Sequence, residues 1–169
     1  RYKSAQRVIQ ELDVLINKYN RRIVTFYDDN FCIKKRRVLE LCDLIVDANF
    51  HKRCKFLLQT RADNFPEDLA PILAESGFTM VGFGMETGSD RIANLIGKGE
   101  TVQQHLDAVE LAKRYNMQVM LYMINGLPTE TKKDRYKSFE IIMKTRPHAP
   151  KFNNLIPYPG TPMFDDLKQ

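Results

Sequence analysis

Met80-Val81-Gly82-Phe83-Gly84-Met85-Glu86-Thr87-Gly88-Ser89 is an apolar run that ends in a polar turn containing glycine. A run of this length bounded by turn residues is typical of a buried β-strand. Other stretches share this composition, and each of them also leads into polar residues: Ile23 to Tyr27, Lys55 to Gln59, Gln118 to Ile124 and Lys151 to Ile156. The sequence therefore predicts a series of strands, with the strand from Met80 to Met85 in their midst.

Apolar residues at helical spacing fill the gaps between these strands. One helix is expected behind Ser4, a typical N-cap residue, and another behind Thr101, which has the capping-box spacing with Gln104. Further helices are expected around Leu41 to Val46, from near Pro66 to Gly77, and after Thr131. Because strand and helix alternate throughout, the expected fold class is α/β with a parallel sheet and right-handed crossovers. No linker is visible, so residues 1–169 are expected to form a single domain.

The chain has 169 residues, which is short for a complete eight-unit barrel of about 250 residues. Its net charge of +5 permits an anionic partner, nucleic acid included, without requiring one. The densest basic run, Lys34 to Arg37, has no interleaved aromatic residues and is interpreted as the solvated start of a helix. No apolar run approaches the roughly 18 residues that a membrane span needs. The odd number of cysteines favours reduced thiols and a cytoplasmic setting.

Polar and glycine residues follow each predicted strand. Ligands of parallel α/β folds bind at the carboxyl ends of the strands, so these residues are expected to lie together. Glu86 stands between glycines that let a bulky ligand approach, and Arg61 offers a planar fork for a carboxylate. The pair Asp28-Asp29 suits an amine or a hard metal ion, and Ile124 beside Gly126 suits a purine ring. An amino acid joined to a nucleoside would satisfy all of these groups.

Several motifs stand in a fixed order along the chain: Tyr27 to Phe31, Arg61 to Asp63, Gly84 to Ser89, Asn125 to Thr131 and Pro157 to Pro162. In order and spacing they resemble the core domain of the radical S-adenosylmethionine (SAM) superfamily. Asp90 to Thr101 most resembles the branch whose members often carry an N-terminal cobalamin-binding domain, and the chain is also similar to tRNA methylthiotransferases. The resemblance implies a partial TIM-type barrel in which this chain supplies about five βα units, the second to sixth strands of a six-stranded barrel.

The resemblance also implies contacts with SAM at these positions: Asp28, Asp29, Arg61, Glu86, Gly88, Ile124, Gly126, Tyr158 and Gly160. The acidic pair would hold the methionyl amino group, Glu86 the ribose or the methionyl part, and Arg61 the SAM carboxylate or the substrate. Ile124 and Gly126 match the stretch that contacts the adenine, and the last two residues match the strand that closes over it. The resemblance implies no catalytic residue.

The chain departs from the family pattern in three places. Tyr122 stands where the family usually has glycine, and the acid after the following loop, Glu130, lies one place beyond the family spacing. The C-x-x-x-C-x-x-C loop, whose thiolates would hold a 4Fe–4S cluster, does not occur in the chain. The resemblance places that loop just before the helix at Ser4, so the chain is expected to be a fragment without the cluster-binding strand and loop. Alone, it is expected to be inactive, to bind SAM weakly at best, and to self-associate through unpaired sheet edges.

The resemblance implies that the parent protein cleaves SAM reductively at the cluster, for methyl transfer or oxidoreduction of a small-molecule substrate, with cobalamin as a further cofactor in related enzymes. Two other interpretations stay open. One is a metal-dependent TIM-barrel lyase in which the Asp28-Asp29 pair and Glu86 bind the metal, although His51, His105 and His148 fall outside the strand-end loops. The other is a non-catalytic interaction module whose polar loops are only turns.

Overall fold

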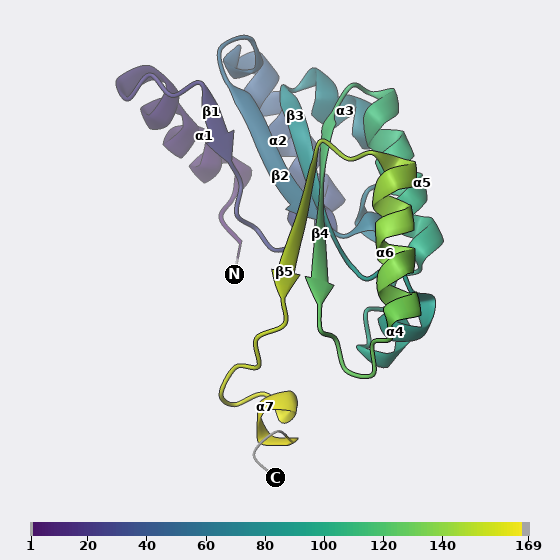
Figure 1. Ribbon diagram of the computed structural model, residues 1–169. Coiled ribbons are helices and arrows are strands. Elements are labelled where there is room, and N and C mark those ends of the chain that lie inside the picture. Colours follow the sequence, from purple (N-terminus) through teal and green to yellow (C-terminus); the bar gives the residue numbers. More distant parts are fainter. Residues whose placement is uncertain (1, 167–169) are drawn as a thin grey trace.

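The computed structural model describes residues 2–166, and its centre is a five-stranded parallel sheet. The strands lie side by side in chain order: β1 (Ile23–Thr25), β2 (Lys55–Thr60), β3 (Phe78–Glu86), β4 (Gln118–Asn125) and β5 (Ala149–Asn154). All neighbouring strands are parallel, so their carboxyl ends lie together at the lower edge of the sheet in Figure 1. The sheet curls into a half-barrel, which confirms the expected α/β partial barrel.

Helices connect the strands. The longer ones are α1 (Ala5–Asp13), which continues into the π-helical turn Val14–Lys18, α2 (Lys35–Asp47), α5 (Val102–Arg114) and α6 (Lys132–Thr145). The shorter ones are α3 (Ala70–Glu75), α4 (Asp90–Leu95) and α7 (Pro162–Asp166), together with 3₁₀ turns at Phe31–Ile33, Phe50–Lys52 and Ala62–Asn64. Helices α2, α3, α5 and α6 cover one face of the sheet (Figure 1). The opposite face is the inner face of the half-barrel.

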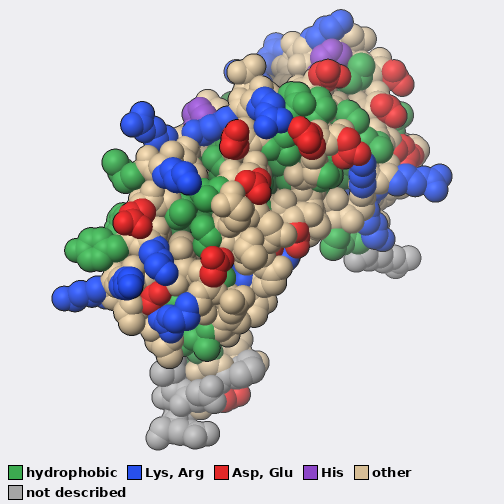
Figure 2. Space-filling view, turned by 90° about the vertical axis from the view of Figure 1, so that its right-hand side faces the viewer, with side chains coloured by type: hydrophobic (Ala, Val, Ile, Leu, Met, Phe, Trp, Pro, Cys, Tyr) green, Lys and Arg blue, Asp and Glu red, His purple; other side chains and the backbone are tan. Residues whose placement is uncertain are grey.

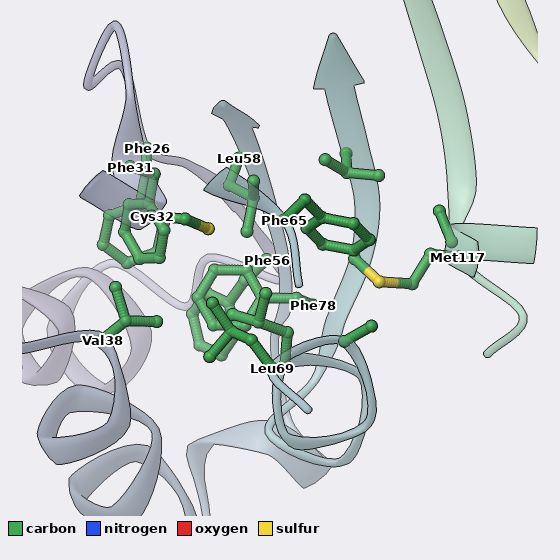
Figure 3. Close-up of a cluster of buried hydrophobic side chains, with 14 of the residues drawn as sticks. Phe26, Phe31, Cys32, Val38, Phe56, Leu58, Phe65, Leu69, Phe78 and Met117 are labelled. Carbon is green, nitrogen blue, oxygen red and sulfur yellow. The ribbon is translucent and has the colours of Figure 1, made fainter. Parts of the chain in front are cut away.

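The core lies between the sheet and these helices, because alternate residues of each strand point to the same side. In β2, Phe56, Leu58 and Thr60 are buried, and Leu57 and Gln59 between them are partly exposed on the inner face. Phe56 belongs to a cluster of aromatic rings whose centroids lie 4.9 to 6.1 Å apart; Figure 3 shows it with Phe26, Phe31 and Phe78. The close packing of these rings fixes β1, β2 and β3 against each other.

The capping signals in the sequence are confirmed. The Ser4 hydroxyl accepts a hydrogen bond from the backbone at the start of α1, and Thr101 and Gln104 form a capping box at the start of α5. A helix follows Thr131, as expected, and Gly77 lies just beyond the end of α3 with a φ of +89°. These local signals therefore place the helix ends without reference to the tertiary fold.

Some boundaries differ from the sequence-based expectation. Helix α3 begins at Ala70 and not near Pro66, because the carbonyl of Pro66 first closes a turn with the N–H of Leu69. The sequence pattern does not predict α4. Strand β5 begins at Ala149, two residues earlier than expected, because its pairing with β4 already starts there. The differences at α3 and β5 lie at the end of an element, where pattern is weakest, whereas α4 is a whole short helix that the pattern does not show.

Helix α6 has exposed apolar side chains along one side. Tyr136, Phe139 and Met143 recur at helical spacing, yet all three are exposed, with Phe139 at 52%. The Phe139 ring stacks on Phe152 of β5 at 5.4 Å. Figure 2, which views the side of α5 and α6, shows hydrophobic side chains at the surface among interspersed acidic and basic ones.

The basic run at the start of α2 has partners within the fold. Lys34 lies over the ring of Tyr2, Lys35 pairs with Asp68, and the Arg37 side chain donates to the carbonyl of Lys3. These contacts agree with the interpretation of the run as the start of a helix. Among residues 2–166, no helix is long and apolar enough to cross a membrane.

Candidate functional site

The loops that follow the strands are tied to one another. The Asn30 amide, after β1, donates to Asn64 Oδ1 (2.6 Å) and accepts from the Thr60 hydroxyl (2.7 Å) at the end of β2. After β3, the Arg91 guanidinium donates to the carbonyl of Thr129 (2.9 Å) in the loop after β4. Because neighbouring loops hold each other, the strand-end edge is an ordered surface on which side chains keep fixed positions.

Glu86 ends β3 on the inner face of the sheet. It has a φ of +66°, and the register between β3 and β4 shifts between Gly84 and Glu86. This bulge turns the side chain back over Gly84, so a Cβ atom on Gly84 would lie only 2.6 Å from Glu86 Oε1. Burial raises the pKa of Glu86, and the ammonium of Lys98, 3.5 Å from Oε1, opposes that shift. The Glu86 carboxylate and the Lys98 ammonium therefore both lie over Gly84, which has no side chain to separate them from the sheet.

Four charged residues, Arg61, Glu86, Lys98 and Glu100, form a cluster at the strand-end edge, and Glu100 is its buried centre. Its side chain is 0% exposed, and its Oε1 accepts hydrogen bonds from the backbone N–H groups of Ala62 (2.7 Å) and Asp63 (3.4 Å) after β2. Its Oε2 lies 3.4 Å from an Arg61 nitrogen and 3.5 Å from Lys98 Nζ. A buried carboxylate requires such partners, because desolvation of an unpaired charge is costly.

Arg61 reaches this cluster, but its guanidinium already has several partners. It donates two hydrogen bonds to Asp63 (2.9 and 2.7 Å) and a third to the carbonyl of Lys98 (3.2 Å). The hydrogen bonds from Arg61 hold the pKa of Asp63 below its usual range. Arg61 and Glu86, both predicted as site residues, are thus brought together through Lys98 and Glu100.

The acidic pair lies at the end of β1. Asp28 Oδ1 is 4.0 Å from a guanidinium nitrogen of Arg37, and Asp29 is exposed. The structure therefore places both at the expected edge of the sheet, with Asp28 facing a cation of α2.

Gly88 is buried, and its lack of a side chain has a packing reason. A Cβ atom there would lie 2.7 Å from the carbonyl of Lys137 and from the backbone of Ser138 on α6. The Gly88 N–H donates to the Ser138 hydroxyl (2.8 Å), and the neighbouring Ser89 hydroxyl donates to Asp134 (2.6 Å). Gly88 thus faces α6, where glycine permits contact between loop and helix. The sequence reasoning assigned it to the approach of a ligand.

Ile124 and Gly126 lie at the end of β4, next to β3. Ile124 is partly exposed, and the N–H of Gly126 donates to Glu130 Oε2 (2.8 Å), which closes the loop. Tyr122, on the same face as Ile124, reaches across β3, because a Cβ atom on Gly82 would lie 2.9 Å from its ring. The two departures from the family pattern thus have structural roles: Glu130 shapes the loop after β4, and Tyr122 covers Gly82.

Tyr158 and Gly160 lie on the segment between β5 and α7, which extends away from the sheet in Figure 1. Tyr158 is 66% exposed. The structure does not bring these two residues to the cluster around Glu86.

Two residues of the cluster, Lys98 and Glu100, were missed by sequence reasoning. A signal for Lys98 was present in the sequence, because it stands between two glycines. Both glycines adopt a positive φ, +65° at Gly97 and +70° at Gly99, so the backbone turns on either side of the lysine. Glu100 precedes the N-cap Thr101 and has the pattern of an ordinary polar residue of a turn. Only its burial distinguishes it from one.

The charged end of SAM fits this arrangement. SAM carries an ammonium and a carboxylate, and the cluster presents the partly exposed Glu86 carboxylate beside the Lys98 ammonium. The cysteines do not fit an iron–sulfur cluster, since Cys32, Cys42 and Cys54 are all buried, and burial raises the pKa of the first two thiols to about 12 and about 11. Within residues 2–166, no three His, Cys, Asp or Glu side chains are grouped so that they could hold a metal ion.

Comparisons with known proteins agree with this fold. The chain is 32% identical over 162 residues to an uncharacterized methyltransferase of Pyrococcus horikoshii, covering 96% of this chain and 35% of that protein. It is 21% identical over 170 residues to the anaerobic magnesium-protoporphyrin IX monomethyl ester cyclase of Cereibacter sphaeroides, covering 99% and 28%.

A solved structure has the same fold. TsrM from Kitasatospora setae, a radical S-adenosylmethionine methyltransferase with cobalamin and a 4Fe–4S cluster bound, matches with a TM-score of 0.85 at 20% identity, over 95% of this chain and 33% of that one. The chain thus spans about a third of the length of these relatives. Residues 1–142 match the family described as the radical SAM superfamily. Because this match covers most of the sequence, the chain belongs to the radical SAM superfamily.

Proposed function

We propose that the full-length protein is a radical SAM enzyme that transfers a methyl group or oxidises a small-molecule substrate, and that this chain forms the SAM-facing part of its barrel. The observation that carries the site is the Glu86–Lys98 pair over Gly84 at the strand-end edge. Family membership and the methyltransferase and cyclase relatives support the chemistry, and they do not favour the metal-dependent lyase or the interaction module.

The proposed SAM site assigns roles to the residues at this edge. Glu86 accepts hydrogen bonds from the SAM ammonium or ribose, and Lys98 binds the SAM carboxylate. Arg61 is a supporting residue in this proposal, because Asp63, Glu100 and the Lys98 carbonyl occupy its donors. Ile124 and Gly126 offer an apolar edge and exposed backbone to the adenine.

The remaining predicted contacts are Asp28, Asp29, Tyr158 and Gly160. Asp28-Asp29 stay a proposed contact for the methionyl amino group. Tyr158 and Gly160 contact the adenine only if the segment after β5 folds back over the sheet.

SAM and a 4Fe–4S cluster together supply reductive cleavage of the sulfonium when both are bound. This chain's residues bind and orient the SAM end of that pair, and the cluster ligands of the full-length protein lie outside residues 1–169. We also propose cobalamin as a further cofactor of the full-length protein, an idea that the cobalamin-bound TsrM structure supports.

The proposal also covers the cell compartment and the association of the chain with itself. The three unpaired cysteines suit a reducing compartment such as the cytoplasm. Edge strands β1 and β5 present unpaired backbone groups, and we propose that the isolated chain self-associates there.

Anaerobic reconstitution of the full-length protein tests the function. With iron, sulfide, a reductant, cobalamin and SAM, we expect 5′-deoxyadenosine, which reports reductive cleavage, or S-adenosylhomocysteine, which reports transfer of the methyl group to cobalamin. Glu86→Gln should raise the KM for SAM about tenfold, because one charge-assisted contact is lost. Glu110→Gln, which makes the same charge change at an exposed position of α5, is the control. Absence of both products, or an unchanged KM in Glu86→Gln, contradicts the proposal.

A further inference from the structure

The segment between α4 and α5 carries a lysine and a glutamate whose side chains both point into the strand-end cluster. Lys98 Nζ lies 3.5 Å from Glu86 Oε1 and 3.5 Å from Glu100 Oε2, so one ammonium is shared by two carboxylates. The Lys98 side chain is 16% exposed and the Glu100 side chain 0%. Glu86 faces the open inner side of the sheet, whereas Glu100 lies beneath.

Glu100 is fixed in place by the main chain of another loop. Its Oε1 accepts from the N–H groups of Ala62 and Asp63, the first residues of the 3₁₀ turn after β2. Hydrogen bonds from main-chain N–H groups hold Oε1 in one position. The position of Oε2, which faces Lys98, is therefore set by the fold and does not depend on the flexible lysine.

The two cations near Glu100, Arg61 and Lys98, differ in how tightly their side chains are held. The Arg61 guanidinium is locked by its paired hydrogen bonds to Asp63. The Lys98 side chain has a long flexible stem, and its ammonium lies 3.5 Å from an oxygen of each carboxylate. If Glu100 were uncharged, the ammonium would be free to move fully onto Glu86, and that pairing would occupy the carboxylate that a ligand needs.

We propose that Glu100 is a positioning residue, which holds Lys98 over Gly84 so that the lysine ammonium meets the carboxylate of the ligand while Glu86 stays available for its other polar groups. The inference rests on the SAM site proposed above. It predicts that Glu100 contributes to binding of the amino-acid end of the ligand and not to binding of the adenosine end. The reason is that ordering of the lysine before binding lowers the entropy lost on binding.

Two ligands distinguish binding of the amino-acid end from binding of the adenosine end. S-Adenosylhomocysteine has the adenosine and the amino-acid end, and 5′-methylthioadenosine keeps the adenosine and the thioether but lacks the ammonium and the carboxylate. Binding of each to the full-length protein is measured by titration calorimetry. Glu100→Gln keeps the shape and an oxygen for the Ala62 N–H and removes the charge. We expect it to weaken S-adenosylhomocysteine about tenfold and to leave 5′-methylthioadenosine within about twofold.

A double-mutant comparison identifies Lys98 as the residue through which Glu100 acts. Lys98→Met should itself weaken S-adenosylhomocysteine, and Glu100→Gln added to it should cause no further loss, because the group that it positions is gone. Glu110→Gln serves as the exposed control with the same charge change and should alter neither affinity. If circular dichroism shows that Glu100→Gln is unfolded, Glu100→Asp replaces it, since it keeps the charge but withdraws it by one methylene group; we expect the same selective loss.

The outcomes separate the positioning role from a merely structural one. Equal weakening of both ligands, or no weakening of either, overturns the inference, as does a full additional loss when Glu100→Gln is combined with Lys98→Met. If the unmodified protein binds neither ligand, the proposed SAM site itself fails, which is a different result from failure of the Glu100 role alone.

Discussion

Two buried carboxylates near the strand ends, Asp134 and Glu100, each have several polar partners. Asp134 is the clearest case: Arg91, Ser89 and Thr131 all donate hydrogen bonds to its carboxylate, and they hold its pKa well below the usual range. Glu100 accepts hydrogen bonds through Oε1 from the loop after β2, and its Oε2 lies 3.4 Å from an Arg61 nitrogen of the same loop. These two acids connect the loops after β2 and β3 to helices that lie far away in the sequence.

His105 of α5 makes the stability of the fold depend on pH. Its Nε2 lies 3.8 Å from Glu100 Oε1, and burial lowers the pKa of His105 from 6.5 to about 4, against the attraction of Glu100. At a pH between these two values, His105 is protonated in the unfolded chain and neutral in the folded chain. The free energy of unfolding should therefore fall as the pH drops from about 6.5 to about 4, and the full contribution should return above about 6.5.

Urea denaturation at a series of pH values measures this effect. His105→Gln should flatten the pH dependence in that window, whereas His148→Gln, at an exposed position, should keep it. The comparison between variants matters because Glu86, whose pKa is raised by burial, acts with the opposite sign and favours folding at low pH. An unchanged slope in His105→Gln would mean that another group causes the pH dependence.

Among the elements, α6 combines a firmly held end with an apolar surface. Its start is fixed by the capping box and by the loop after β3, through Gly88 and Ser89. Farther along, Tyr136 and Met143 project outward beside Phe139, which stacks on edge strand β5. An exposed apolar stripe next to an unpaired strand favours contact with another surface.

Self-association of the isolated chain should therefore depend on this stripe. Replacing Tyr136 and Met143 together by Gln should lower the oligomeric fraction, because apolar area is lost at the contact. Light scattering over a range of concentrations measures it. Arg135→Gln combined with Lys144→Gln is the matched control, since it changes the same helix without removing apolar area. Equal association of both double variants, or a monomer throughout, would count against this surface.

At the scale of the whole molecule, the three cysteines lie on separate segments of the fold. Cys32 lies in the turn after β1, Cys42 on α2, and Cys54 just before β2, so they do not meet at the strand-end edge. Burial raises the pKa of all three thiols, which disfavours the thiolate that iron requires. Within residues 2–166, the cysteines therefore do not form a cluster site beside the proposed SAM site.

Reconstitution of the 169-residue chain with ferrous iron and sulfide under anaerobic conditions should give no visible absorption of a 4Fe–4S cluster. The variant with all three cysteines replaced by alanine is the control and should behave identically. SAM affinity of this chain alone should also be weak, because in the proposed function a 4Fe–4S cluster would supply part of the SAM site. A visible band that disappears with the cysteines removed would show that the chain assembles a cluster after all.

Local patterns in the sequence were sufficient for the sheet, several helix ends and the family. Apolar runs, capping residues and the polar loops after each strand act over a few residues, so they can be read without the fold, and Asp28, Arg61 and Glu86 indeed lie at the strand-end edge. The tertiary structure decided the rest. It showed that Gly88 faces α6, that Arg61 is already engaged, and that Lys98 and Glu100 complete the charged cluster. These facts depend on contacts between residues up to fifty positions apart, and burial and pairing of that kind arise only when the chain is folded.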